Sequence, residues 1–137
     1  MKLSHSKSNP VSLVLTEDEF LIVRQAMNEV VNGMRIPDFE LRMGTTRERA
    51  SQVLDVLYGD GLASRIVRRN AGELELHVTG FELDVFKKAL GEVCYSLPRS
   101  QFVLRMPVDD FREGMAVLHS LVGIVDELPL TLLRDIV

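Results

Sequence analysis

The chain has 137 residues, a length that suits one domain with its own hydrophobic core. Its 46% hydrophobic and 26% charged residues are ordinary for a globular protein, and no stretch reaches the ~20 apolar residues of a membrane span, so we expect no insertion into a membrane. The net charge of -4 argues against non-specific binding to nucleic acid and suits association with a basic partner.

Residues 1–10 are polar and carry Lys2 and Lys7 without an apolar segment behind them. This pattern does not predict a secretory signal, so we expect a cytoplasmic protein. We interpret residues 1–10 as a disordered tail and residues 11–137 as a single domain.

The domain repeats itself after 63 positions. Eleven identities occur in 38 compared positions, against about two expected by chance at ordinary composition. The repetition predicts two tandem, pseudo-symmetric units, residues 11–72 and 73–137. The identical pairs are Leu13/Leu76, Thr16/Thr79, Glu19/Glu82, Ala26/Ala89, Glu29/Glu92, Val30/Val93, Phe39/Phe102, Leu41/Leu104, Arg42/Arg105, Met43/Met106 and Arg49/Arg112.

Each unit opens with alternating apolar residues, which predict strands at residues 11–16 and 74–79. Apolar residues then recur at helical spacing, which predicts long helices at about 17–33 and about 80–97. The apolar stripes are Phe20, Val23, Met27, Val30, Val31 and Met34 in the first helix, and Leu83, Phe86, Leu90, Val93, Cys94 and Leu97 in the second.

A short Phe-x-Leu-Arg-Met segment follows each long helix, at residues 37–43 and 100–106. Its alternation favours a strand, whereas its first and last residues also form a helical i,i+4 pair, so both structures stay open. A second helix then begins in each unit at a capping pattern, Thr45-x-x-Glu48 or Asp110-x-x-Glu113.

Residues 62–69 and 73–79 flank Asn70-Ala71-Gly72, which predicts a β-hairpin between the units. Residues 128–137 are too apolar for a free tail and are expected to pack on the body or on a partner. The predicted fold class is α+β, with the two opening strands and the hairpin forming a small antiparallel sheet covered by helices.

Catalytic chemistry finds no support in the sequence. There is no Gly-x-Ser-x-Gly elbow and no glycine pattern that cradles phosphate. The single cysteine, Cys94, lies in an apolar helical stripe, and the three histidines are scattered without metal-ligand spacing. We therefore expect a protein that is not an enzyme, with no catalytic residue, no metal and no cofactor.

Glu29 and Arg42 of the first unit recur as Glu92 and Arg105 of the second. We expect one structural ion pair within each unit, which would hold the long helix to the segment after it. The functional alternative is a pair of symmetry-related sites on a binding face.

The run Gly44-Thr45-Thr46-Arg47-Glu48, followed by Gly61-Leu62, resembles the helix-turn-helix of winged-helix transcription regulators of the cAMP-receptor-like class. The resemblance implies a recognition helix at residues 46–58 and a wing in the hairpin at residues 62–79. On that resemblance, the nucleic-acid-binding residues would be Thr46, Arg47, Arg49 and Gln52 on the helix and Arg65, Arg68 and Arg69 on the wing.

A second resemblance covers each unit. Residues 26–30 with Asn32-Gly33, followed by Phe39, Arg42 and Gly44, look like a set of short uncharacterised bacterial proteins that carry a single such unit. This resemblance implies a small bacterial module and supplies no activity.

Two functions are weighed. The first is a non-enzymatic protein-binding module that acts by occupying a partner, such as an inhibitor or an immunity protein against a basic bacterial toxin, and it rests on the acidic charge and the duplication. The alternative is a winged-helix DNA-binding transcription regulator, which rests on the motif at residues 44–62. The apolar content also suits a homodimer.

Overall fold

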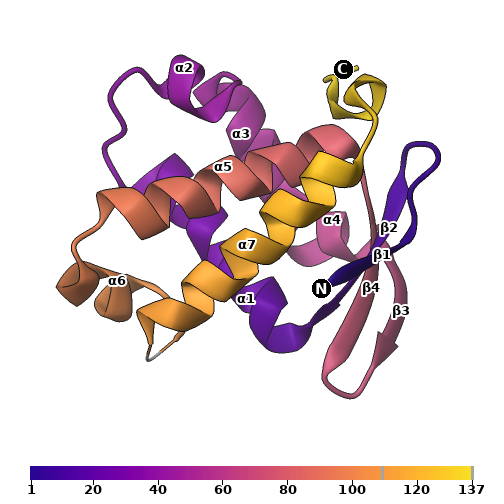
Figure 1. The fold of residues 1–137 in the computed structure, drawn as a ribbon, viewed down its shortest axis with the longest axis horizontal. Helices are drawn as coiled ribbons and strands as arrows, with labels where there is room; N and C mark the ends of the chain where they lie inside the picture. Colours follow the sequence, from indigo (N-terminus) through magenta and orange to yellow (C-terminus); the bar gives the residue numbers. More distant parts are fainter. Residues whose placement is uncertain (109, 137) are drawn as a thin grey trace.

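The chain has an α+β fold, seen in a computed structural model that describes residues 1–108 and 110–136 (Figure 1). A four-stranded antiparallel sheet lies at one end of the molecule, and the helices pack against its inner face (Figure 1). The strand order is β1-β2-β4-β3. The strands are β1 (Lys2–His5), β2 (Val11–Thr16), β3 (Ile66–Asn70) and β4 (Glu73–Val78).

Strand β2 leads directly into helix α1 (Glu17–Asn28) through Thr16. The Thr16 hydroxyl accepts a hydrogen bond from the backbone of Glu19, and the Glu19 carboxylate accepts one from the backbone of Thr16, so both ends of a capping box are made. A π turn, η1 (Glu29–Gly33), extends α1. Three short helices follow, α2 (Phe39–Met43), α3 (Arg47–Asp55) and α4 (Gly59–Ala63).

Strand β4 leads into helix α5 (Gly80–Ser96) through the same device, a capping box between Thr79 and Glu82. Helices α6 (Arg99–Arg105) and α7 (Phe111–Glu127) follow, and a short 3-10 turn, η2 (Leu130–Leu133), comes last. The order strand, long helix, short helix, helix therefore occurs in both units. Superposition of the two units stays a prediction.

The two opening strands pair with each other across the units. Leu13 lies opposite Leu76, and these two residues are separated by the 63 positions of the sequence repeat. Moving each residue of a flanking pair by 63 positions, into the other unit, gives another pair of the same two strands, as Val11–Val78 gives Leu15–Leu74. The register is therefore self-complementary, as in the contact of a two-fold homodimer. The inward-facing pairs are Val11–Val78, Leu13–Leu76 and Leu15–Leu74.

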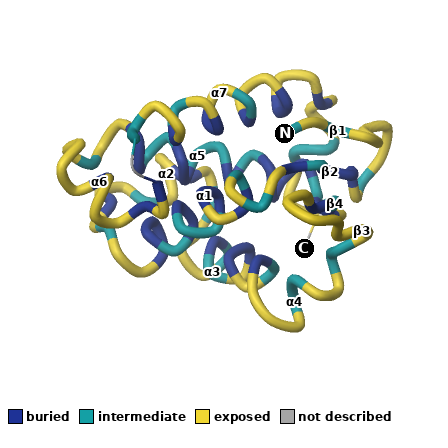
Figure 2. The backbone as a smooth tube through the Cα atoms, turned by 90° about the horizontal axis from the view of Figure 1, so that it is seen from below, coloured by how far each residue is buried: buried dark blue, intermediate teal, exposed yellow. Residues whose placement is uncertain are grey.

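Helix α5 is the centre of the core. Figure 2 shows it in the middle of the helical layer, with α7 on one side and α1 and α3 on the other. Apolar residues along its length, from Phe81 to Cys94, are buried. The outward side of α7 is exposed (Figure 2).

Three local expectations are wrong. Residues 2–5 form β1 rather than a disordered tail, because Leu3 lies opposite Leu13 and packs on the core. Leu62 belongs to helix α4, so the hairpin strand starts later, at Ile66. The N-cap of α3 is Thr46 rather than Thr45, since the Thr46 hydroxyl accepts from the backbone of Arg49.

The open structural questions are answered by packing. The segments at 37–43 and 100–106 are mostly helical, as α2 and as the larger part of α6, because the helical spacing of Phe39 and Met43 lets both side chains reach the core. The described part of the C-terminal segment packs on the body. Leu128 is buried, and the Asn9 side-chain amide donates to the carbonyl of Leu132.

Candidate functional site

The helix predicted to read DNA is held by contacts within the chain. The Arg47 guanidinium donates from Nη1 to the carbonyl of Val31 at 2.8 Å and lies 4.4 Å from the centre of the Phe39 ring. The Thr46 hydroxyl is occupied as the N-cap of α3. Arg47 therefore joins α3 to α2 and to η1, and Thr46 caps α3 itself.

Arg49 binds the C-terminal segment. Its Nε and Nη2 atoms donate to the two carboxylate oxygens of Asp135 at 2.8 and 3.0 Å, and Nη1 donates to the Gln52 amide oxygen at 3.2 Å. The hydrogen bond to Asp135 is the main cause that raises the pKa of Arg49. Asp135 thus binds a side chain that the DNA interpretation placed on the recognition helix.

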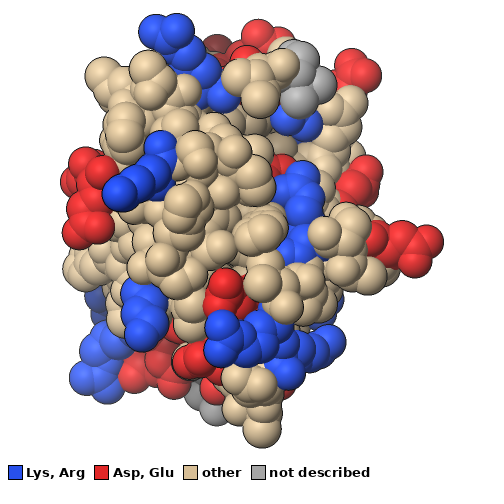
Figure 3. Space-filling view, turned by 90° about the vertical axis from the view of Figure 1, so that its right-hand side faces the viewer, with Lys and Arg blue, Asp and Glu red and all other residues tan. Residues whose placement is uncertain are grey.

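The arginines of the predicted wing also face carboxylates. Arg65 donates to both oxygens of the buried Glu82 at 2.6 and 2.9 Å. Arg68 pairs with Glu75, and Arg69 pairs with Glu17. Figure 3, which views the sheet end of the molecule, shows Lys and Arg beside Asp and Glu rather than one continuous basic patch.

The recurring glutamates and arginines form two ion pairs, but the expected pairing within each unit is wrong. Arg105 Nη1 of α6 lies 3.1 Å from the Glu29 carboxylate in η1, and Arg42 Nη2 of α2 lies 2.8 Å from the Glu92 carboxylate in α5. Helix α2 packs on α5 of the other unit, and the Arg105 side chain of α6 reaches Glu29 of η1. The four residues are therefore part of the contact between the units.

A hollow of about 320 Å³ lies between α1 and α7. Ile22 and Val117 form an apolar floor and are both buried, whereas Asp18 and Glu113 on the rim are exposed. Neither rim carboxylate has an ion-pair partner in the part of the chain that the structure describes. The remaining lining residues are Glu19, Ala116 and Ser120.

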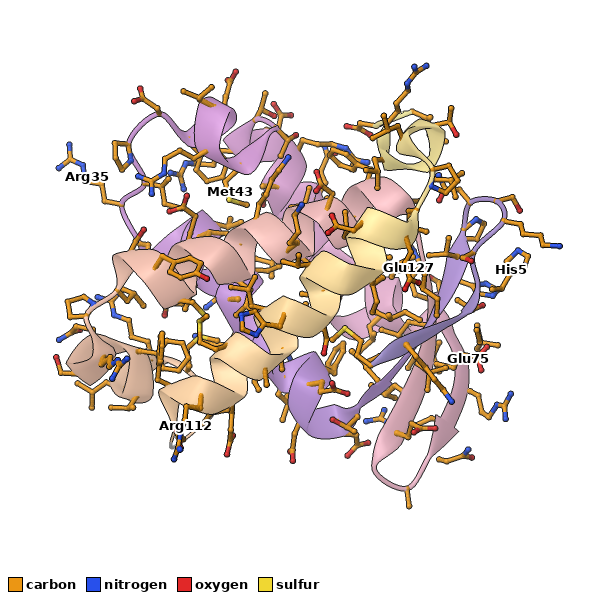
Figure 4. The ribbon with its side chains drawn as sticks, viewed as in Figure 1. His5, Arg35, Met43, Glu75, Arg112 and Glu127 are labelled. Carbon is orange, nitrogen blue, oxygen red and sulfur yellow. The ribbon has the colours of Figure 1, made fainter. Side chains whose placement is uncertain are left out.

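A second hollow, of about 370 Å³, continues along α7 toward β1 and shares Ser120 with the first. We call the two hollows together the α7 groove. Its α7 side includes a row of residues spaced three and four apart, Glu113, Ala116, Ser120, Gly123 and Glu127, and beside this row Val117, His119 and Ile124. Figure 4 shows Glu127 at the opposite end of α7 from Arg112.

Sequence reasoning missed the α7 groove. The sequence assigns Glu113 only to a capping pattern and gives Asp18 no role. The available signal was the regular spacing of Glu113, Ala116 and Ser120, which places them on one helix face. The second wall, α1, could come only from the tertiary structure.

The described residues provide neither a metal cluster nor an activated thiol. Within residues 1–108 and 110–136, no cluster of three or more His, Cys, Asp or Glu side chains is placed to hold a metal ion. Burial raises the pKa of the Cys94 thiol to about 11, so it is not an activated nucleophile. No described helix is long and apolar enough to span a membrane.

Comparison with known proteins adds no relative to this description. No family model, curated protein or solved structure matches the chain.

Proposed function

We propose that the chain is a non-enzymatic binding module that acts in the cytoplasm by occupying a partner protein, as an inhibitor or an immunity protein against a basic toxin does. A basic segment of the partner lies in the α7 groove. The observation that carries the proposal is the pairing of an apolar floor, Ile22 and Val117, with unpaired carboxylates on the rim, Asp18 and Glu113.

Each part of this arrangement has a role in binding. Burial of a partner's apolar side chain on the floor supplies affinity, at about 25 cal/mol per Å² of apolar surface removed from water. The unpaired rim carboxylates and the net charge of -4 steer a basic partner and fix its position. The small side chains of Ala116 and Gly123 leave room for close approach.

The DNA-binding alternative receives less support from the same contacts. Phosphate recognition needs exposed cations that are free to bind, and the arginines on the predicted helix and wing already contact carboxylates or carbonyl groups of the chain. A duplex would have to replace these partners one by one.

Affinity capture from the native cell, with the full chain as bait, tests the binding module. The wild-type chain should recover one basic protein at about equal stoichiometry, and the amount should fall with salt. The bait Asp18→Lys/Glu113→Lys should recover at least about tenfold less of that same protein, because it reverses the rim charge.

A matched control separates the groove from net charge. Glu48→Lys/Asp60→Lys makes the same charge change in the first turns of α3 and α4, away from the groove residues, and should recover the partner as the wild type does. Equal recovery by the groove variant, or no partner above background at low salt, would show that the proposal is wrong.

A further inference from the structure

Two of the most exposed leucines occupy equivalent positions in the two units. Leu41 of α2 is 83% exposed and Leu104 of α6 is 77% exposed, and the two are 63 positions apart. Single exposed leucines are common on protein surfaces. This pair differs from such single leucines because Leu41 and Leu104 form one of the eleven identical pairs between the units.

The other ten identities all have a structural role. They are core residues, capping residues or members of ion pairs, and only the leucine pair contributes to none of these. The core pairs are Leu13/Leu76, Ala26/Ala89, Val30/Val93, Phe39/Phe102 and Met43/Met106, and the others are Thr16/Thr79, Glu19/Glu82, Glu29/Glu92, Arg42/Arg105 and Arg49/Arg112.

Each leucine is presented on a fixed support. Met43 is fully buried and lies beneath α2 in Figure 4, so helical geometry places Leu41 on the opposite, outward side. The neighbouring residue Arg42 fastens α2 to α5 through Glu92. In α6, the buried Phe102 and the Arg105–Glu29 pair hold Leu104 outward in the same way.

The charges beside the two leucines are opposite. Asp38 and Glu40 beside Leu41 are exposed and carry no ion pair among the described residues. Near Leu104, Arg99 is exposed and has no ion pair among the described residues, Arg105 is paired with Glu29, and residues 95–108 contain no acidic residue. Contact of α2 with another α2 would bring like charges together, whereas contact of α2 with α6 brings opposite charges together.

We propose that a second copy of this chain is the partner of these helices, with Leu41 of one copy packed on Leu104 of the next. The contact is heterologous, so each added copy leaves one free α2 and one free α6, and association runs head to tail. Each contact patch is one short helix, which places the interaction in the weak class below about 1,200 Å². The α7 groove shares no residue with these patches, so the proposal stands apart from the proposed function.

Sedimentation velocity of the full chain up to about 1 mM tests the contact, because an interaction of this size is weak. The wild type should form dimers and longer species as concentration rises. Leu41→Ser and Leu104→Ser should each be monomeric alone, since each lacks one of the two patches. Mixed in equal amounts, they should form dimers and nothing longer, because one intact patch remains on each.

Two further variants complete the test. Leu130→Ser removes a leucine that is 80% exposed in η2 and should associate as the wild type does. Glu40→Arg should weaken association about tenfold or more, and Glu40→Arg/Arg99→Glu in one chain should restore it, since each contact again joins opposite charges.

The competing outcomes are distinct. A wild type that stays monomeric throughout, or single Leu→Ser variants that still associate alone, would overturn the head-to-tail contact. An equal loss in Leu130→Ser would show general apolar association instead. All of these leucines are exposed, so unchanged circular dichroism and unfolding midpoints are expected and verify that the variants are folded.

Discussion

Arg105 of the second unit lies 3.1 Å from the carboxylate of Glu29 in the first, and the equivalent pair, Arg42 and Glu92, joins the units in the opposite direction. The two pairs exchange partners in the way that subunits of a two-fold dimer do. The strand register agrees, because the central pair Leu13–Leu76 is also related by the repeat. The units are thus joined by a self-complementary contact within one chain.

A double-mutant cycle measures this exchange. Glu29→Gln should lower the free energy of unfolding by about 2 kcal/mol, between the values for exposed and buried pairs, because Glu29 is buried and Arg105 is half-exposed. Glu29→Gln and Arg105→Gln should couple by about 1 kcal/mol or more in urea unfolding.

The control cycle pairs Glu29→Gln with Arg42→Gln, which lie in the same unit and share no ion pair among the described residues. Their effects should add to within about 0.5 kcal/mol. Coupling between Glu29 and Arg42 larger than that between Glu29 and Arg105 would contradict the exchanged arrangement.

The sequence predicted the elements better than their partners. Alternation of Leu13 and Leu15 identified β2, and the spacing of Thr16 and Glu19 identified the start of α1, because these signals are local. The partner of Glu29 could not be read, since a repeat leaves pairing within a unit and pairing between units equally consistent with the letters. Only the tertiary structure, which places Arg105 of α6 beside Glu29 of η1, decides it.

Two features of the surface were not predicted from the sequence, for a related reason. The polar run at residues 1–10 hides a strand because only Leu3 of β1 packs on the core. The arginines at positions 49 and 65 read as a basic patch because their partners, Asp135 and Glu82, are distant in sequence. Charge patterns along a chain therefore overestimate the free charge on its surface.

Substitution by alanine should change the stability of the fold in opposite directions at two glycines of α7. A Cβ built at Gly114 would lie 2.5 Å from Cζ of the fully buried Phe102, whereas one at Gly123 meets nothing within 4 Å. Gly114→Ala should destabilise the fold by about 1–3 kcal/mol through overpacking. Gly123→Ala should stabilise it by up to about 1 kcal/mol through helix propensity, and thermal unfolding of both variants measures the contrast. Equal shifts of one sign would show that the Phe102 contact has no effect.

The engaged arginines predict that the chain does not bind duplex DNA. A low-salt titration of a labelled duplex should show no shift, because Arg49 and Arg65 are bound by carboxylates. Arg49→Gln should instead lower stability by up to about 1 kcal/mol and make the C-terminal segment easier to cleave with protease. A duplex shift that falls steeply with salt and is lost in Arg47→Gln/Arg49→Gln would support the winged-helix alternative.

Burial of Cys94 gives a pH dependence with a definite sign. The thiol is 4% exposed in the folded chain, and burial raises its pKa from the ordinary value of 9.0 to about 11. Between these two values the unfolded chain loses the thiol proton while the folded chain keeps it, so stability should be unaffected below about pH 9 and fall as pH rises toward 11. Subtracting the pH profile of urea unfolding of Cys94→Ala from that of the wild type isolates the contribution of this thiol from those of other groups.

A second measurement is labelling of Cys94 by iodoacetamide at pH 8, which should be slow in the native chain and should speed up with denaturant. Fast labelling of the native chain, or a difference profile that stays flat to pH 11, would show that the thiol is accessible to solvent.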